Sequence, residues 1–248
     1  MGNNATVTGM ILSAMPMSEF DKRVTILTLD RGKIAAFARG ARRQNSPLLA
    51  ATNPFVFGEF VLYEGRSSYN LQSASVTNYF SDLTSDLANT YYGMFFLEMA
   101  EYFSQENNDE KQVLRLLYQS LRALESGKYE RRLVKVIYEW KMLMLNGIYP
   151  NMFSCQCCGK KENLYGFSLR RAGMLCKECC EQEYAKPLHP STLYTLQYII
   201  ATEITKLFRF SVTEEVLQEL EDILKSYRGQ YVNHIFKSEK FLEDGLLQ

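Results

Sequence analysis

The sequence predicts an α+β protein of more than one domain, with a small all-β unit first and helices after it. Three observations predict this order. Short β-like runs broken by turn residues fill residues 6–76, helical periodicity begins near Ser81, and all six cysteines lie between Cys155 and Cys180. We therefore expect an N-terminal barrel, a helical C-terminal domain and a cysteine-rich insert within the helices.

The N-terminal region is expected to form five strands, over residues 6–14, 23–29, 33–39, 55–63 and 69–76. The turn Asp30-Arg31-Gly32 is typical of a hairpin, because glycine supplies the positive φ that a tight or bulged turn needs. Five short strands in about 75 residues fit a small barrel, and the oligonucleotide/oligosaccharide-binding (OB) fold is the commonest five-stranded design. An SH3-like barrel is the alternative.

The remainder of the chain is expected to form five helices, over residues 81–103, 109–127, 129–146, 191–208 and 213–227. Apolar residues recur there at three- and four-residue spacing. Asp109 and Gln112 resemble a capping box that opens the second helix, and Gly127 is placed to close it. Thr213 is the expected N-cap of the last helix.

These patterns divide the chain into an OB-fold domain (1–80), a first helical part (81–149), a zinc-binding insert (150–185) and a second helical part (186–248). The formal net charge is zero, but it is unevenly distributed. Residues 1–80 hold eight Lys and Arg against five acids, which leaves +3 there and −3 in the remainder. A basic N-terminal unit is thus joined to a mildly acidic one.

The cysteines form two clusters with the spacing of a zinc site. Cys155 with Cys158, and Cys176 with Cys179, give the pattern C-x2-C-x17-C-x2-C. Two cysteines separated by two residues can turn both sulfurs toward one ion, and four thiolates complete a tetrahedral zinc site. Because four protein ligands leave no position for a reactive water, the spacing favours one structural zinc over a catalytic one.

Other interpretations of the cysteines remain open from the sequence. Cys157 or Cys180 could replace a neighbour in the ligand set, and an iron–sulfur cluster also uses four thiolates. Disulfides would need an oxidising compartment, whereas residues 1–8 are polar and unlike a signal peptide. No apolar run approaches the length of a membrane span. We therefore expect a cytoplasmic protein.

The sequence lacks the motifs of the common enzyme classes. It contains two histidines, His189 and His234, and neither lies near a cysteine cluster or in an H-E-x-x-H motif. No phosphate-binding loop, dinucleotide-binding glycine fingerprint, hydrolase nucleophile elbow or deaminase His-x-Glu occurs. We therefore expect a protein without enzymatic activity.

The third predicted strand has a face suited to single-stranded nucleic acid. Alternation places Lys33, Phe37 and Arg39 on one face, so that cations flank an aromatic ring. Cations bind phosphates and a ring stacks on a base. The following loop carries Arg42 and Arg43, which extend the basic track. This combination predicts DNA binding at the barrel.

Several motifs also follow one another in the order and spacing of a known family. They are Gly9-x-Ile11-Leu12, Ser18-Glu19-Phe20-Asp21-Lys22, Thr25-x-Leu27-Thr28-x-x-x-Gly32-Lys33 and Ala38-Arg39-Gly40-Ala41-Arg42-Arg43, with a late Tyr-x-x-x-x-Phe-Lys-Ser pattern that ends at Ser238. The chain resembles the bacterial RecO recombination mediators over nearly its whole length. The N-terminal motifs carry the resemblance, because the helices are generic.

The resemblance implies an OB-fold that binds single- and double-stranded DNA, anneals complementary strands, and works with RecR and the single-stranded DNA-binding protein. It implies a nucleoid-associated protein of the bacterial cytoplasm. Carried over by position, the DNA-binding candidates are Lys33, Phe37, Arg39, Arg42 and Arg43, and the zinc ligands are Cys155, Cys158, Cys176 and Cys179.

The acidic, aromatic-ended tail of the single-stranded DNA-binding protein would need a cationic rim around an apolar pocket. Candidates for that rim on the central helices are Arg115, Arg122, Arg131, Arg132 and Lys135.

Two other functions compete with a DNA-binding mediator. One is a zinc-organised protein-interaction scaffold without DNA annealing, and the other is a nuclease or transferase that uses scattered carboxylates. Steep loss of DNA affinity with rising salt would favour the mediator over the scaffold.

Overall fold

The computed structural model describes residues 3–65 and 68–243, and the chain divides into two compact units. Unit 1 consists of Met1–Ser126 and Phe236–Gln248, and unit 2 is Gly127–Ile235. Residues 236–243 therefore belong to the same unit as the N-terminal strands.

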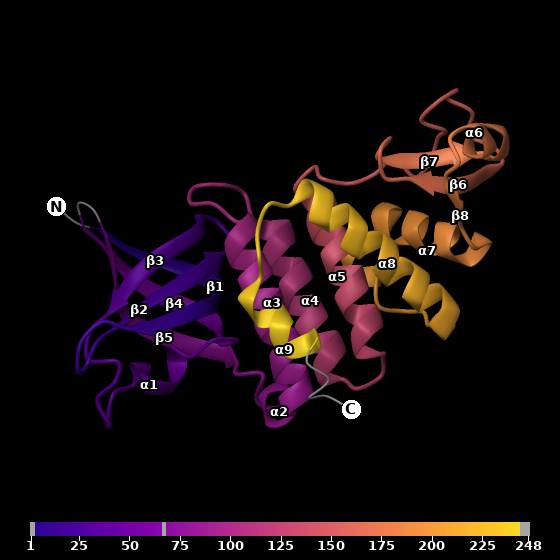
Figure 1. The fold of residues 1–248 in the computed structure, drawn as a ribbon. Helices are drawn as coiled ribbons and strands as arrows, with labels where there is room; N and C mark the ends of the chain where they lie inside the picture. Colours follow the sequence, from indigo (N-terminus) through magenta and orange to yellow (C-terminus); the bar gives the residue numbers. More distant parts are fainter. Residues whose placement is uncertain (1–2, 66–67, 244–248) are drawn as a thin grey trace. The chain divides into compact units, whose positions relative to one another are not determined.

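Unit 1 contains a closed barrel, drawn in indigo and violet in Figure 1. Its strands are β1 (Asn3–Pro16), β2 (Lys22–Thr28), β3 (Gly32–Ala38), β4 (Phe57–Glu64) and β5 (Tyr69–Asn78). They pair in the order β1-β2-β3-β5-β4, and β1 also pairs with β4 to close the barrel. Among the strand pairs that the structure describes in this barrel, only the short β3–β5 pairing is parallel. The predicted five-stranded OB barrel is confirmed.

β1 closes the barrel because it pairs along both edges. Residues 3–10 pair with β4, and residues 9–16 pair with β2. The register shifts between Ile11 and Ser13, and a bulge of this kind bends a strand and increases its twist. One long, bent strand can thus belong to both sides of a small barrel.

The pleat of β3 separates the barrel interior from its surface. Ile34, Ala36 and Ala38 are buried and join the barrel core, whereas Lys33 and Phe37 lie on the outside. This agrees with the alternation expected from the sequence. Small alanines on β3 leave space inside the barrel for larger residues such as Phe60 on β4, which is fully buried.

The β2–β3 hairpin is fixed by three residues of the Thr28-to-Lys33 motif. The Thr28 hydroxyl donates to the Gly32 carbonyl at 2.8 Å and accepts from the Arg31 amide at 3.0 Å. The Lys33 amide donates to the Gln105 carbonyl at 2.9 Å. Gly32 has φ +64°, and a Cβ at this position would lie 2.1 Å from the Gln105 oxygen. The glycine is required by both its conformation and this close approach.

The helices of unit 1 are α1 (Leu48–Ala51), α2 (Ser81–Ser85), α3 (Leu87–Phe103), α4 (Lys111–Glu125) and the C-terminal α9 (Lys240–Glu243). The single helix predicted over 81–103 is wrong, because Asp86 is extended and its carboxylate accepts from the Asn89 amide at 2.8 Å to cap α3. The predicted capping box is also wrong, since the N-cap of α4 is Glu110 and Asp109 accepts from the Lys111 amide.

The late Tyr-to-Ser238 motif holds the C-terminal segment against α3. The Glu98 carboxylate accepts from the backbone amides of Lys237 and Ser238, both at 2.8 Å. These residues open the 3₁₀ turn η2 (Lys237–Glu239). Phe236 is buried, with its ring centroid 5.6 Å from those of Phe95 and Tyr102. The Phe236-to-Ser238 part of the motif is thus a structural anchor within unit 1, whereas the residues before Phe236 belong to unit 2.

Unit 2 is built on α5 (Arg131–Leu145), α7 (Pro190–Ala201) and α8 (Glu214–Tyr231), which contact one another. The cysteine segment adds β6 (Leu164–Ser168), β7 (Gly173–Cys176), α6 (Lys177–Gln182) and β8 (Lys186–Pro187), with sheet order β7-β6-β8 (Figure 1). Thr213 caps α8 as predicted. A helix with the length and apolar character of a membrane span is not found among residues 3–65 and 68–243.

The helix predicted over 191–208 is too long, because α7 ends at Ala201 and only the 3₁₀ turn η1 (Ile204–Lys206) follows. The buried Lys141 ammonium donates to the carbonyls of Ile199, Ile200 and Thr202 at 2.7–3.2 Å. Burial lowers the pKa of Lys141. A cation at a helix C-terminus satisfies carbonyls that have no partner within the helix, so Lys141 stabilises this end.

Gly32→Ala tests the hairpin contact, and Gly127→Ala is its matched control. Gly127 has nearly the same φ, +62°, but nothing lies within 4 Å of a Cβ placed there. The control should lose about 1 kcal/mol of unfolding free energy from the left-handed conformation alone. Gly32→Ala should lose at least about 2 kcal/mol more, because the Gln105 carbonyl must move. Urea denaturation of both variants measures the difference, and equal losses would contradict the proposed contact.

Candidate metal centre and nucleic-acid interface

The four cysteines selected by spacing lie together in unit 2. The sulfurs of Cys155, Cys158, Cys176 and Cys179 all fall within 4.8 Å of one another, and those of Cys158 and Cys176 are 3.7 Å apart. Four sulfurs at about 2.3 Å from a central zinc would be about 3.8 Å apart. The cluster is therefore compatible with tetrahedral metal binding.

Two different local structures present the sulfurs. Cys155 and Cys158 lie on a turn closed by the Gly159 amide donating to the Cys155 carbonyl at 2.9 Å, and Gly159 has φ +76°. Cys176 ends β7, and Cys179 lies in the first turn of α6. The turn thus supplies one pair of cysteines and the start of the helix supplies the other. The small sheet brings the two pairs together.

Backbone amides around the cluster favour thiolates. Burial raises the pKa of Cys155, but amides of Cys158, Cys176 and Cys157 donate to its sulfur and bring the pKa down to about 6. At Cys158 the Lys160 amide acts in the same direction, but burial and the side chains of Cys155 and Cys176 raise the pKa of Cys158 above its usual value overall. Metal ligation requires the thiolate, so these amides support that form.

The other two cysteines lie outside this cluster. The Cys157 side chain is exposed, and its sulfur is 3.9 Å from Glu183 Oε1. Cys180 is buried and its thiol donates to the Ala185 carbonyl at 3.2 Å. Burial raises the pKa of Cys180, which favours the neutral thiol. Neither residue joins the four sulfurs that lie together.

Three basic residues beside the cluster are paired with carboxylates. Lys160 Nζ is 2.8 Å from Glu178, and Glu183 binds both Arg170 and Arg171. Hydrogen bonds from Arg171 and then Arg170 hold the pKa of Glu183 below its usual range. These three cations of the cysteine segment are therefore engaged in ion pairs.

In unit 1, two loops at one end of the barrel are tied together. We call residues 39–43 the arginine loop and residues 17–21 the β1–β2 loop. The Gly40 amide donates to Asp21 Oδ1 at 2.8 Å, and the Arg42 amide donates to the Phe20 carbonyl at 2.9 Å. Arg42 Nη1 also donates to the Ser18 carbonyl at 2.7 Å. These bonds give both loops a defined conformation.

The arginine loop presents its charges to solvent. Arg39, Arg42 and Arg43 are exposed. The Arg43 guanidinium lies 5.3 Å from the centre of the Phe20 ring, within cation–π range. Phe37, at the end of β3 beside this loop, is 36% exposed. Four of the five predicted DNA-binding residues therefore lie close together at one end of the barrel.

Lys33, the fifth candidate, lies elsewhere. Its Nζ donates to the Glu101 carbonyl at the C-terminal end of α3. The Glu101 carboxylate accepts from the hydroxyls of Ser13 and Thr25 at 3.3 and 3.2 Å. The end of α3 thus covers this half of the outer barrel face, and Lys33 is a structural contact of that helix.

Sequence reasoning missed residues that share the open half of this face. Strand register places Met15 opposite Arg23 and Arg23 opposite Phe37, so the three lie side by side across β1, β2 and β3. Met17 is 55% exposed and Phe20 is 41% exposed. The alternation of buried and exposed residues along 22–28 could have placed Arg23 on the outside of the barrel. Its neighbours on β1 and β3 depend on the pairing register, which no single strand specifies.

A cleft of about 620 Å³ borders the same residues. Met17, Arg23, Phe37 and Tyr69 line it, together with the carboxylates Glu64 and Glu106. Arg31 pairs with Glu64 at 3.0 Å. The cleft is therefore polar, with aromatic rings on its walls.

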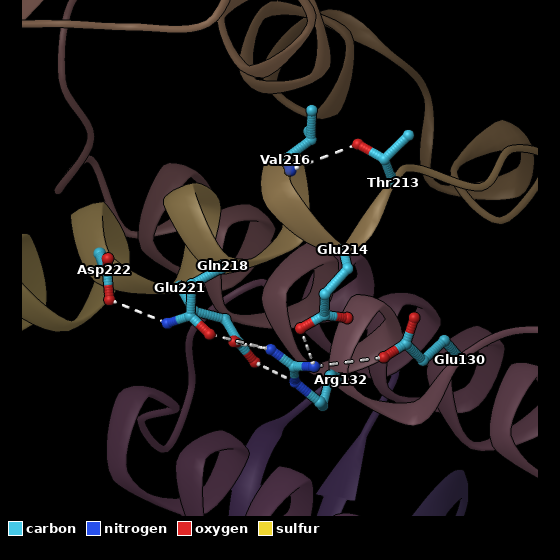
Figure 2. Close-up of polar contacts among 8 residues, drawn as sticks. All are labelled: Glu130, Arg132, Thr213, Glu214, Val216, Gln218, Glu221 and Asp222. Atoms are coloured by element: carbon cyan, nitrogen blue, oxygen red, sulfur yellow. Dashed lines mark hydrogen bonds and ion pairs between the residues drawn. The ribbon is translucent and has the colours of Figure 1, made fainter.

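Most of the predicted cationic rim residues bind carboxylates. Arg132 contacts Glu130, Glu214 and Glu221 in a network drawn in Figure 2, with its Nη2 2.6 Å from Glu221. The hydrogen bonds that Arg132 donates to Glu221, and then to Glu214, raise the pKa of Arg132. The remaining contacts pair Lys135 with the buried Glu139 and Arg122 with Glu125.

Arg115 differs from these because it borders an apolar pocket of about 200 Å³. Leu29, Phe57, Leu114 and Tyr118 form the rest of its lining, and Arg115 itself is exposed. Of the five rim candidates, this residue best matches the expected combination of a cation and an apolar pocket.

Comparison with known proteins decides the family. Residues 1–80 match the family model for the recombination protein O N terminal region, and residues 84–240 match that for its C terminal region. The chain belongs to the RecO family of DNA repair proteins. Proteins named DNA repair protein RecO are similar over nearly the whole length. The one from Bacillus pumilus is 31% identical over 94% of this chain and 91% of its own, and that from Caldanaerobacter subterraneus is 32% identical over 94% of both.

The tie between the loops should respond to acid. The Gly40 amide, followed by Ser18, holds the pKa of Asp21 below 3.8. A lowered folded pKa means that this carboxylate stabilises the fold at higher pH and loses that contribution as pH falls through the folded value. The Gly40 amide resonance should therefore titrate with a midpoint below 3.8 in an NMR series, and Asp21→Asn should abolish the transition. A midpoint above 3.8 would contradict the contact.

Proposed function

We propose that this RecO family protein is a non-enzymatic mediator of recombinational DNA repair. It binds single- and double-stranded DNA, anneals complementary strands, and helps to load recombinase together with RecR in the bacterial cytoplasm, at the nucleoid. The observation that carries the DNA-binding part is the exposed cluster of Arg39, Arg42 and Arg43 beside Phe37 on the barrel. The partnership with RecR rests on family membership.

The contacts of Arg42 and Arg43 orient these side chains without neutralising them. Arg42 donates to a backbone carbonyl and Arg43 stacks on a ring. In contrast, Arg132 and Arg171 bind carboxylates. The charge of an arginine whose partners are neutral remains available to bind a phosphate. The adjacent Phe37 ring offers a stacking surface for a base. The proposed DNA surface therefore comprises Phe37, Arg39, Arg42 and Arg43, and Lys33 supports it indirectly by holding the end of α3.

Annealing requires the mutual repulsion of two strands to be screened while their bases stay accessible. A basic surface on a rigid barrel does this by binding energy alone. The N-terminal segment 1–80 would be the DNA-binding domain, and the helical segments 81–149 and 186–248 would flank the zinc segment 150–185.

We propose that Cys155, Cys158, Cys176 and Cys179 hold one structural zinc. Their mutual distances fit a tetrahedral site, and the amides that surround Cys155 are typical support for a thiolate ligand. A zinc held by four thiolates has no open position. It would stabilise the small sheet and α6, which contain few other buried apolar residues.

For the tail of the single-stranded DNA-binding protein, we propose the pocket beside Arg115. An aromatic side chain fits an apolar pocket lined by Phe57 and Tyr118, and a carboxylate would pair with Arg115. This proposal adds a protein-docking site to the barrel unit.

Cys158→Ser tests the zinc site, with Cys157→Ser as its control. Loss of one thiolate should lower zinc content to well under one per chain and should destabilise unit 2 by several kcal/mol, because metal binding is coupled to folding. Cys157 is a neighbouring, exposed thiol outside the cluster, so its variant should keep full zinc and stability. Metal analysis and thermal unfolding measure both. Equal zinc loss in the two variants would refute the ligand assignment.

The double reversal Arg39→Glu with Arg42→Glu tests the DNA surface. Removal of each phosphate-binding cation should flatten the slope of log affinity against log salt by roughly 0.7–0.9, so the two changes should reduce it by about 1.5. Annealing of complementary strands, measured without nucleotide, should slow in proportion. Annealing by the native protein should not depend on ATP, because binding energy alone accounts for it.

The matched control reverses Lys111 and Lys206, which changes the net charge equally. Both are exposed, and Lys111 lies near Asp30 at the far end of the β2–β3 hairpin from Arg39. The control should show the same slope of log affinity against log salt as the native protein. If the arginine variant binds single strands normally, the DNA surface is wrongly placed. If the native protein binds no DNA, the scaffold function replaces the mediator.

A further inference from the structure

We propose that the barrel carries a stacking ledge, formed by Met15, Met17, Phe20, Arg23 and Phe37, which caps the terminal base pair of a duplex as two strands anneal. This inference deepens the proposed function and rests on it. It assigns a second role to the barrel end, in which apolar and planar side chains contact paired bases while the arginine loop holds phosphates.

The ledge is a continuous surface on three strands and one loop. Met15, Arg23 and Phe37 are cross-strand neighbours. Because adjacent strands lie about 4.8 Å apart, the row from Met15 to Phe37 spans roughly 10 Å, which is more than a single base needs. Met17, Arg23 and Phe37 also line one cleft, which places the loop residue next to the row.

The four large apolar side chains of the ledge are exposed. Met15 is 63% exposed and Met17 is 55% exposed, while Phe20 and Phe37 are 41% and 36% exposed. Solvent-exposed clusters of large apolar residues mark contact surfaces. The end of α3 covers the other half of the same barrel face through Glu101, so the exposure is confined to the half that adjoins the arginine loop.

Hydrogen bonds hold the loop part of the ledge in a defined conformation. The Met17 amide donates to the Asp21 carbonyl at 3.0 Å, which closes the β1–β2 loop on itself. Asp21 and Phe20 each accept a hydrogen bond from a backbone amide of the arginine loop. A surface that is already ordered loses little entropy when it binds, as a stacking platform requires.

Charge identifies a nucleic acid as the occupant. Arg23 lies between Met15 and Phe37 on the ledge, and Arg39, Arg42 and Arg43 follow on the arginine loop. Of the acids nearby, Asp21 accepts from the Gly40 amide and Glu64 pairs with Arg31, whereas Glu19 is exposed and Glu106 lines the cleft. An apolar surface with arginines beside it matches the end of a duplex, where phosphates surround the flat face of a base pair. Methionine and phenylalanine side chains are known to stack or wedge against base steps, and a guanidinium stacks on bases.

The test variant is Met15→Thr with Met17→Ser. Both side chains are more than half exposed, so the change should leave the fold intact, which circular dichroism checks. Binding is compared for a DNA hairpin with a single-stranded tail and for the tail alone. The affinity of the variant for the hairpin should fall about tenfold, and its affinity for the tail should stay unchanged. The slope of log affinity against log salt should also stay unchanged, because stacking contacts neutralise no phosphate. Annealing should slow correspondingly.

The control variant, Leu87→Thr with Met94→Ser, removes two exposed apolar side chains from α3, which are 61% and 43% exposed. It should bind both DNAs as the native protein does. The ledge is refuted if the Met15 and Met17 variant keeps the native ratio of hairpin to tail affinity, or if the native protein shows no preference for the hairpin. The DNA binding of the variant with Arg39→Glu and Arg42→Glu is a separate measurement, which tests the proposed function and not the ledge.

Discussion

Closure of the barrel through β1 is the constraint on which the rest of unit 1 depends. Because β1 pairs with β2 along residues 9–16 and with β4 along residues 3–10, it fixes the register of both neighbours. A shift of one residue would turn every side chain to the opposite face. The same register therefore determines which residues are buried, such as Ile34 and Ala36, and which are exposed, such as Phe37 and Arg23. The proposed DNA surface is a consequence of how the barrel core is packed.

The outer face of the barrel is divided by α3. Around Ser13, Thr25 and Lys33, three polar groups converge on Glu101, and the helix end shields them from solvent. Met15 and Arg23 lie two residues from Ser13 and Thr25, Phe37 lies four residues from Lys33, and these three cross-strand neighbours are open. The Gly32–Gln105 contact holds the segment after α3 on the hairpin, so it also determines where the shielded half ends. A helix that moved by one turn would either bury the open half or expose the polar one.

Local patterns predicted the strands and the cysteine cluster because their information lies within a few residues. Alternation along β3 and the x2 spacing of Cys155 and Cys158 are of this kind. The break at Asp86 was missed, since the hydrophobic period continues through it and only the carboxylate hydrogen bond to Asn89 reveals a new helix. The contact of Lys33 with Glu101 joins residues far apart in sequence. No local pattern distinguishes such a lysine from one that faces solvent.

The same limitation explains why basic residues alone indicate a binding surface poorly. Arg132 and Arg171 are as cationic as Arg42, but carboxylates from other elements occupy their donors. Arg42 and Arg43 are held by a carbonyl and a ring, and the nearby Asp21 carboxylate is engaged by the Gly40 amide. An approaching phosphate would therefore displace no internal ion pair at the arginine loop, whereas at Arg132 it would compete with three glutamates. The hydrogen-bond partners of a cation, more than its exposure, decide whether its charge is available for DNA.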